Sequence, residues 1–271
     1  MTQLFNGDRR VDLTGFSKTE LSINGILTVV YRAGKGQPLL FMHGAATWHG
    51  FDFARGWTSQ FEVIIPYHPG FGPSQSSAEF TTVDHYVSHY AELAEVLGLS
   101  RFHLVGFSLG GWMAAHFAAK HANRVDRLVL VAPAGLEVLD HPQPDLSTIT
   151  PDEILGYLVH DLRTLQPYLP NGEDAEFAAM REKEGTTVAG LLRNGTLNHP
   201  DMAQVLQKIS SPTLLIWGIK DRLVPPDQGA AWQQLIAGAS LKIFPGAGHL
   251  ALDESPAACN EVAAFLSEGT A

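Results

Sequence analysis

Residues 102–114 read FHLVGFSLGGWMA, and this stretch decides the fold. An apolar run of strand type, FHLV, stops at Gly106, and a helical pattern, WMAAHFAAKHA, follows. Between the two, Ser108 is surrounded by Gly106, Gly110 and Gly111. Where a strand turns sharply into a helix, the residues next to the turn must be small. A serine at the turn then exposes its hydroxyl at the positive end of the helix dipole. The stretch therefore predicts a nucleophile elbow with Ser108 at its tip.

Short apolar runs alternate with helix-like segments along most of the chain. This alternation is typical of a mostly parallel sheet covered by helices on both faces. One expected helix begins after Thr81 or Thr82 and stops before Gly98, and the last helix begins at Pro256, capped by Ser255. We therefore expect a doubly wound α/β fold. The expected strands are Leu27–Tyr31, Pro38–Met42, Glu62–Pro66, Phe102–Val105, Leu128–Val131, Thr213–Trp217 and Leu241–Phe244.

The alternation is interrupted between residues 136 and 208, where the sequence reads as helical. Thr150 and Glu153 form a capping box before an apolar stripe. We expect a core domain of residues 1–135 and 209–271, with residues 136–208 inserted as a helical lid (cap). Open α/β sheets bind ligands at the carboxyl ends of their strands, so the insertion should cover that edge. The stripe consists of Ile154, Leu155, Leu158, Leu162 and Leu165.

A serine hydroxyl is a weak nucleophile until a base takes its proton, and a third group must orient that base. In this architecture the chain order is serine, then acid, then histidine. Asp221 follows one expected strand by four residues, and His249 follows the next by five. Both therefore fall on loops at the same sheet edge as Ser108. We predict Ser108 as nucleophile, Asp221 as acid and His249 as base.

Attack on a carbonyl also needs hydrogen-bond donors for the oxyanion that forms. The strand PLLFM runs into His43-Gly44-Ala45-Ala46-Thr47-Trp48, the place from which such a loop contributes a backbone N–H. We assign the two oxyanion-hole donors to the amides of Ala45 and Leu109. His43 is interpreted as a residue that shapes the loop by hydrogen bonding, because His249 already supplies the base.

With these motifs in place, the sequence resembles the α/β-hydrolase superfamily. FMHGA, PYHPGFGPS, GFSLGG, WGIKDRLVP and GAGH occur in the family's order, and the resemblance covers the chain from about Ile23 onward. It implies the same triad and oxyanion-hole residues. The sequence departs from many relatives at Tyr67, where they carry aspartate two residues before the proline of PGFG. That departure does not affect the triad.

Serine at the elbow disfavours the subfamilies with an aspartate nucleophile and leaves acyl chemistry. Our first hypothesis is a carboxylesterase-like serine hydrolase for small to medium, largely apolar esters. Alternatives are a C–C bond hydrolase of vinylogous diketones (meta-cleavage type), a perhydrolase-like enzyme, and a ligand-binding receptor with the same fold. C–C hydrolases usually have asparagine before the serine, where this chain has Phe107. Candidate substrate-binding residues are Trp48, Phe107, Trp112, Tyr157 and Leu158.

Composition and charge bear on partners and location. A net charge of −10 without any block of lysine and arginine weighs against nucleic acid or an anionic membrane as partner, and favours a small-molecule substrate. The single cysteine, Cys259, cannot form an intrachain disulfide, and no signal peptide or spanning segment is evident, so we expect a cytoplasmic protein. No cofactor or metal is expected, and the oligomeric state is left open.

Overall fold

The computed structural model describes residues 13–268, and its centre is one eight-stranded sheet with the order β1-β2-β4-β3-β5-β6-β7-β8. The β1–β2 and β2–β4 pairs are antiparallel, and all other neighbours are parallel. The expected α/β fold with a mostly parallel sheet is confirmed. The strands are β1 (Ser17–Ile23), β2 (Ile26–Ala33), β3 (Gln37–Met42), β4 (Phe61–Pro66), β5 (Phe102–Phe107), β6 (Val125–Val131), β7 (Thr213–Gly218) and β8 (Ser240–Phe244).

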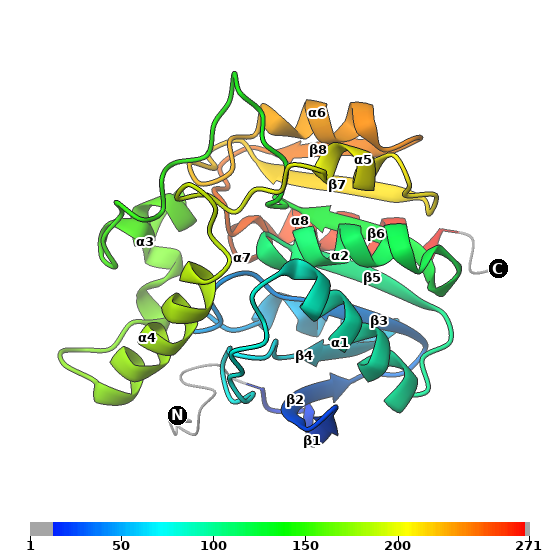
Figure 1. Ribbon diagram of the computed structural model, residues 1–271, viewed down its shortest axis with the longest axis horizontal. Helices are drawn as coiled ribbons and strands as arrows, with labels where there is room; N and C mark the ends of the chain where they lie inside the picture. Colours follow the sequence, from blue (N-terminus) through cyan, green and yellow to red (C-terminus); the bar gives the residue numbers. More distant parts are fainter. Residues whose placement is uncertain (1–12, 269–271) are drawn as a thin grey trace.

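Helices cover both faces of the sheet (Figure 1). One face carries α1 (Val83–Val96), α2 (Leu109–Lys120), α5 (Met202–Leu206) and α6 (Gln228–Leu235), which contact one another in sequence order. The opposite face carries the 3₁₀ helix η1 (Asp52–Ser59) together with α7 (Ala251–Glu254) and α8 (Pro256–Ser267). A short η2 (Ala122–Arg124) leads into β6. No helix within residues 13–268 is long and apolar enough to cross a membrane.

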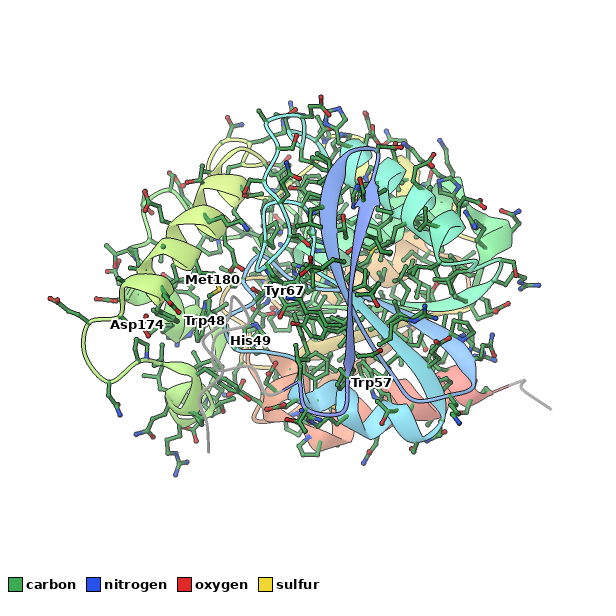
Figure 2. All side chains as sticks on the ribbon, turned by 90° about the horizontal axis from the view of Figure 1, so that it is seen from below. Trp48, His49, Trp57, Tyr67, Asp174 and Met180 are labelled. Atoms are coloured by element: carbon green, nitrogen blue, oxygen red, sulfur yellow. The ribbon has the colours of Figure 1, made fainter. Side chains whose placement is uncertain are left out.

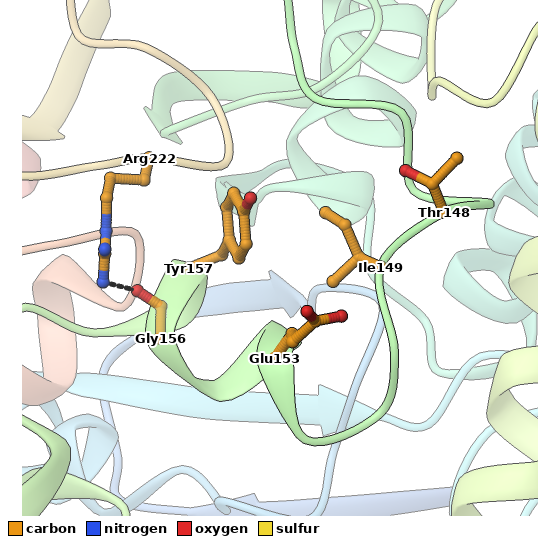
Figure 3. Close-up of a pocket in the computed structure, with 6 residues that line it drawn as sticks. All are labelled: Thr148, Ile149, Glu153, Gly156, Tyr157 and Arg222. Atoms are coloured by element: carbon orange, nitrogen blue, oxygen red, sulfur yellow. Dashed lines mark hydrogen bonds between the residues drawn. The ribbon is translucent and has the colours of Figure 1, made fainter.

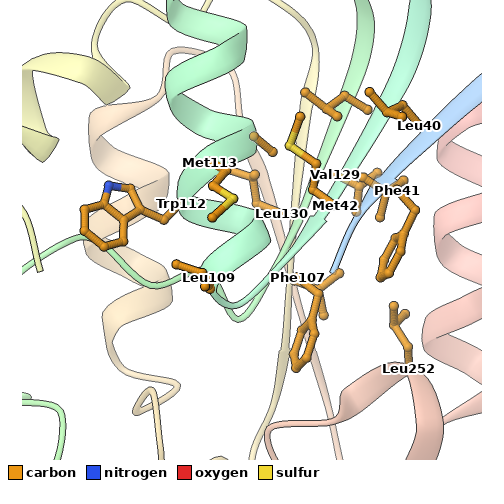
Figure 4. Packing of buried hydrophobic residues seen from close by; sticks show 14 of the residues in the cluster. Leu40, Phe41, Met42, Phe107, Leu109, Trp112, Met113, Val129, Leu130 and Leu252 are labelled. Carbon is orange, nitrogen blue, oxygen red and sulfur yellow. The ribbon is translucent and has the colours of Figure 1, made fainter. Parts of the chain in front are cut away.

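The central strands are buried on both faces, which explains their continuous apolar runs. Every residue of β5 and β7 is buried. Figure 4 shows this core from close by, with Met113 of α2 near Val129 and Leu130 of β6. The edge strands β1 and β8 are mostly exposed or half-buried. The core therefore lies where β3, β5, β6 and β7 meet, and their carboxyl ends carry the loops of the candidate site.

The strand β1 was not among the expected strands. Its sequence, SKTELSI, is polar and mostly exposed because it forms the sheet edge. It is joined to β2 by Asn24 and Gly25, which have φ of 50° and 82°. An Asn-Gly pair between two strands is a strong signal for a tight hairpin, so the turn could have revealed this strand.

Residues 136–208 connect β6 to β7 and contain five helical elements before the chain returns to the sheet. Figure 1 places α3 and α4 beside the sheet, next to one end of the strands. The capping box is present, because Thr150 N–H donates to Glu153 Oε2 at 2.9 Å and Glu153 N–H to Thr150 Oγ1 at 3.3 Å. The elements are α3 (Glu153–Leu158), η3 (Leu162–Thr164), η4 (Gln166–Tyr168), α4 (Ala175–Ala189) and α5 (Met202–Leu206).

The apolar stripe from Ile154 to Leu165, which recurs at helical spacing, is divided in the structure. The helix α3 ends at Leu158, and Leu162 is 57% exposed. The chain leaves the helix because its next residues bind the core: Leu250 N–H donates to Leu158 O at 2.8 Å, and His160 N–H donates to the Glu254 carboxylate at 3.1 Å. Tertiary hydrogen bonds therefore override the helical pattern at this point.

Candidate active site

Ser108 occupies the turn between β5 and α2. Its φ of 52° and ψ of −116° lie in a region that residues with a Cβ rarely adopt. The surrounding backbone holds the turn: Ser108 N–H donates to Val131 O at 2.9 Å, and Ser108 O accepts from Trp112 N–H and Ala134 N–H, both at 3.0 Å. A strained residue that the backbone fixes from several sides is typical of a functional position.

The glycines around Ser108 are required by close packing. A Cβ added at Gly110 would lie 2.1 Å from the carbonyl oxygen of Met42. One added at Gly106 would lie 2.6 Å from the Cβ of Ala114, and one at Gly111 would lie 2.7 Å from a Pro133 carbon. Only glycine lets α2 approach β3, β5 and the segment after β6 this closely.

Asp221 and His249 lie on the loops after β7 and β8 and form a buried pair. His249 Nδ1 is 2.8 Å from Asp221 Oδ2. Asp221 Oδ1 accepts from the N–H groups of Leu223 and Val224 at 2.8 and 2.9 Å, which fixes the carboxylate in its loop. Because the carboxylate accepts, His249 Nδ1 carries the ring proton and Nε2 presents a lone pair, which is the tautomer that a general base requires.

The elbow, the histidine and the loop after β3 converge. The rings of Phe107 and His249 have centroids 4.9 Å apart. A Cβ added at Gly44 would lie 2.7 Å from the Phe107 ring and 3.4 Å from the Cβ of Ser108. Ser108 is 5% exposed and His249 1%. The three predicted triad residues therefore lie at one edge of the sheet, and all three are buried.

The two predicted oxyanion donors flank this point. Leu109 is the first residue of α2, and Ala45 lies just after Gly44 in the loop that follows β3. Within residues 13–268, neither backbone N–H donates to a protein acceptor. The N–H of Leu109 lies at the positive end of the α2 dipole. The assignment of these two amides to an oxyanion hole stays a prediction.

His43 shapes the start of the same loop. Its Nε2 accepts from His68 N–H at 3.0 Å, so the neutral ring carries its proton on Nδ1, which donates to Gly44 O at 2.7 Å. Burial lowers the pKa of His43 well below its ordinary value, and the neighbouring His68 ring lowers it further. The two rings stack at 3.6 Å between centroids. His43 is thus a neutral residue with two hydrogen bonds, which agrees with its interpretation as a residue that shapes the loop by hydrogen bonding.

His68 follows the position at which the sequence departs from many relatives, and it is equally constrained. Its Nε2 donates to His43 O at 2.8 Å, which leaves Nδ1 to accept from the Tyr90 hydroxyl at 2.5 Å. Burial lowers the pKa of His68 to about 3. Both histidines are therefore neutral supports for the loop after β3.

Trp48 and Phe107 lie near the candidate site. Trp48 is 3% exposed, and its ring meets Phe177 of α4 edge to face at 5.9 Å. Figure 2 shows Trp48 and His49 between the sheet core and the insertion, close to Met180 of α4. Phe107 contacts His249 directly. Trp48 therefore belongs to the contact between the insertion and the core, and Phe107 to the immediate surroundings of the triad.

Trp112 lies on the other side of the elbow. Its ring packs against Gly135, where a Cβ would lie 2.7 Å from the indole, and that Cβ would also lie 3.2 Å from Met202 of α5. In Figure 4 the Trp112 and Phe107 side chains point away from each other. The contacts of Trp112 are those of a residue that packs α2 against α5.

Tyr157 lines a cavity of about 280 Å³ between the insertion and the loop after β7 (Figure 3). Arg222, next to the acid Asp221, lies over the Tyr157 ring at 5.8 Å and donates to Gly156 O. Leu158 is buried, and its carbonyl oxygen accepts a hydrogen bond from Leu250 N–H. These contacts connect α3 to the loops that carry Asp221 and His249. The cavity is lined by Thr148, Ile149, Glu153, Gly156, Tyr157 and Arg222.

Two acids at this edge, the half-buried Glu254 and the buried Glu184, were not singled out from the sequence. Glu254 accepts from the N–H groups of Gly248 at 2.6 Å and Asp161 at 2.8 Å, and so ties the His249 loop to the insertion. Glu184 of α4 is 2% exposed and binds two core loops. Glu184 occurs in the charged run REKEG, which resembles an exposed helix face, so periodicity gave no signal for it. Among the described residues, no three His, Cys, Asp or Glu side chains are placed to hold a metal ion.

Comparison with known proteins identifies the family. The Alpha/beta hydrolase family model matches residues 39–262. The chain is 27% identical over 263 residues to 2-hydroxy-6-oxo-6-phenylhexa-2,4-dienoate hydrolase of Burkholderia cepacia, covering 88% of this chain and 90% of that one. It is 30% identical over 237 residues to Lipase 1 of Psychrobacter immobilis, covering 81% and 74%. A crystal structure of a membrane phospholipase A, a bacterial virulence factor, matches with a TM-score of 0.77 at 25% identity, covering 94% and 86%. The resemblance expected from the sequence is confirmed, and the chain is a hydrolase that belongs to the alpha/beta hydrolase family.

Proposed function

We propose that this enzyme hydrolyses small to medium, largely apolar carboxylic esters through a covalent acyl-enzyme on Ser108. One observation carries the proposal: a strained serine at a helix N-terminus lies at the same sheet edge as a buried His249–Asp221 pair with the tautomer of a general base. The comparisons are consistent with it, since a lipase is among the relatives.

In the proposed first half-reaction, Ser108 Oγ attacks the ester carbonyl carbon while His249 Nε2 takes the hydroxyl proton. The oxyanion of the tetrahedral intermediate accepts from the N–H groups of Ala45 and Leu109. His249 then gives its proton to the departing alkoxide, and the alcohol leaves. Asp221 keeps the ring oriented and stabilises the imidazolium without taking the proton itself.

In the second half-reaction, water attacks the acyl carbon and gives a proton to His249. The second tetrahedral intermediate uses the same two amides. As it collapses, the proton returns from His249 to Ser108 Oγ, and the carboxylic acid leaves. Both halves use only groups present in this chain, so the mechanism needs no cofactor.

The size preference follows from the surroundings of Ser108. The serine, His249 and Phe107 are all less than 8% exposed, and the insertion holds the loops on both sides of them. We propose that residues 136–208 act as a lid and that Trp48, Phe107, Tyr157 and Leu158 contribute to the apolar lining. A bulky or charged ester would be excluded by such a site.

A second candidate is hydrolysis of a C–C bond in a vinylogous diketone. It is favoured by one observation, the similarity to a 2-hydroxy-6-oxo-6-phenylhexa-2,4-dienoate hydrolase over most of both chains. The proposed triad and the two amides would serve that reaction as well. A perhydrolase-like reaction would use the same serine intermediate, and a receptor would bind the ligand without turnover.

The test is steady-state hydrolysis of p-nitrophenyl acetate, butyrate and octanoate by the wild type and by Ser108→Ala. The proposal predicts multiple turnovers with the shorter esters and loss of at least about 10³-fold in kcat/KM in the variant. Ester turnover that persists in Ser108→Ala would contradict the assigned nucleophile. No turnover on any ester, together with cleavage of a 2-hydroxy-6-oxo-dienoate, would favour the second candidate.

A further inference from the structure

Glu184 is a buried carboxylate in the helix α4 that only accepts hydrogen bonds. It receives the N–H of Thr47 at 3.1 Å, the hydroxyl of Thr47, and the N–H of Gly72 at 3.0 Å. Burial raises the pKa of Glu184 above its ordinary value, while these hydrogen bonds and the His49 ring act in the opposite direction. A buried acid is costly for folding, so its position between two loops of the core calls for a functional explanation.

The Glu184 contacts reach the segment that we assign to the oxyanion hole. Thr47 lies two residues after Ala45, and its carbonyl accepts from Gly50 N–H at 3.1 Å. At the other end of the segment, the His43 ring donates to Gly44 O. Ala45 and Ala46 therefore span a short distance between two fixed points, one held by His43 and the other by Glu184.

The neighbouring residue Lys183 distinguishes general attachment of α4 to the core from attachment of α4 to the loop that contains Ala45. Its Nζ donates to Gly72 O at 2.7 Å and to Ser74 O at 2.6 Å, so it also attaches α4 to the core. Thr187 adds a bond from its hydroxyl to Gly70 O at 3.2 Å. Of these three side chains, Glu184 alone has hydrogen bonds to the loop that contains Ala45.

We propose that Glu184 is a positioning residue that holds the Ala45 N–H toward the oxyanion, and so makes the insertion a part of the catalytic geometry. The inference rests on the proposed function, because it needs Ala45 as a donor. Glu184 acts through hydrogen-bond geometry and not through its charge, since an added negative charge near the oxyanion would oppose catalysis. Its removal should therefore weaken stabilisation of the transition state more than binding of the substrate.

The test compares Glu184→Gln with Lys183→Met. For each protein, kcat and KM are measured with p-nitrophenyl butyrate, and the inhibition constant is measured for phenylboronic acid, which forms a tetrahedral adduct on a catalytic serine. A thermal midpoint is recorded for each variant. In Glu184→Gln we expect kcat to fall by about 10- to 100-fold, KM to stay within about threefold, and boronate affinity to fall with kcat. In Lys183→Met we expect kcat and boronate affinity to stay within about threefold of wild type.

Three results would overturn the inference. Unchanged kcat and boronate affinity in Glu184→Gln would show that the carboxylate does not position the donor. Tighter boronate binding in that variant would show that its charge matters and its geometry does not. An equal loss in Lys183→Met would show that any loosening of α4 has the same effect.

Two further measurements keep the inference distinct from its premise. If Glu184→Gln does not fold, Thr47→Val is used in its place, because it removes only the hydroxyl that donates to Glu184. We expect kcat and boronate affinity to fall in Thr47→Val, by less than in Glu184→Gln. Full activity in Thr47→Val would contradict the inference. If the wild type hydrolyses esters and Ser108→Ala does not, an unaffected Glu184→Gln rejects this inference only. If the wild type hydrolyses no ester, the proposed function fails and the inference fails with it.

Discussion

Gly110→Ala should damage both stability and activity, because Gly110 is where α2 meets the end of β3. An alanine Cβ would lie 2.1 Å from Met42 O and 2.3 Å from His43 O, about 1.3 and 1.1 Å short of ordinary contact at 3.4 Å. Both atoms belong to the backbone, so the strand and the helix must separate. Overpacking of this kind costs about 1–3 kcal/mol, whereas alanine gains at most about 1 kcal/mol over glycine in a helix.

We therefore expect a net loss of about 1–2 kcal/mol, or about 2–8 °C in the thermal midpoint for a chain of this size. Activity should fall further, because the displaced segment carries Leu109 on one side and the start of the Ala45 loop on the other. A misplacement near 1 Å can cost about 100-fold in rate. The assays are thermal unfolding and kcat/KM with p-nitrophenyl butyrate.

The matched control is Gly185→Ala, in the interior of α4, where an added Cβ meets no atom within 4 Å. This variant should be stabilised by about 0.5–1 kcal/mol through helix propensity, with activity near wild type. A Gly110→Ala protein as stable and active as Gly185→Ala would refute the close approach at the elbow.

Other predictions concern the triad, the lining and the buried acid. Asp221→Asn should keep most of the stability, because the side-chain oxygen of asparagine can still accept from the N–H groups of Leu223 and Val224. The amide group that then faces His249 Nδ1 should impose the wrong tautomer on the ring and lower kcat by about 10³- to 10⁴-fold. A loss in kcat below tenfold would contradict the pairing of Asp221 with His249. Trp112→Phe should leave KM for p-nitrophenyl butyrate within about twofold, whereas Phe107→Ala should change it several-fold; equal changes in KM would contradict the placement of the two rings. Because the pKa of Glu184 is raised, the folded state binds the carboxyl proton more tightly than the unfolded state. The contribution of this proton to the free energy of unfolding is therefore complete below about pH 4.3, the ordinary pKa of glutamate, and is lost as pH rises through the raised pKa of the folded state. Urea unfolding from pH 4 to 8 should show wild type losing stability relative to Glu184→Gln as pH rises, and a constant difference would reject that pKa shift.

The sequence predicted the central sheet well because its strands are buried on both faces and their apolar runs are continuous. The elbow was also visible, since glycine at positions 106, 110 and 111 has a local steric cause. The order of Ser108, Asp221 and His249 along the chain placed them on loops at one sheet edge, and the structure has Asp221 and His249 within hydrogen-bond distance.

The remainder depended on contacts between distant segments. The capping box at Thr150 predicted where α3 begins, but the end of α3 is set by Leu250 and Glu254, about 90 residues away in the chain. Glu184 is buried only because α4 packs against the loops after β3 and β4. Local patterns carry no information on such pairings, so the attachment of the insertion could not be predicted from periodicity.

The most direct test of the central claim is to identify the residue that forms the covalent intermediate. The wild type is treated with a fluorophosphonate, digested, and analysed by peptide mass spectrometry, with Ser108→Ala as the control. We expect one adduct, on Ser108 in the peptide containing GFSLGG, formed in step with loss of esterase activity and absent in the variant. An adduct on another residue, or loss of activity without any adduct on Ser108, would contradict it.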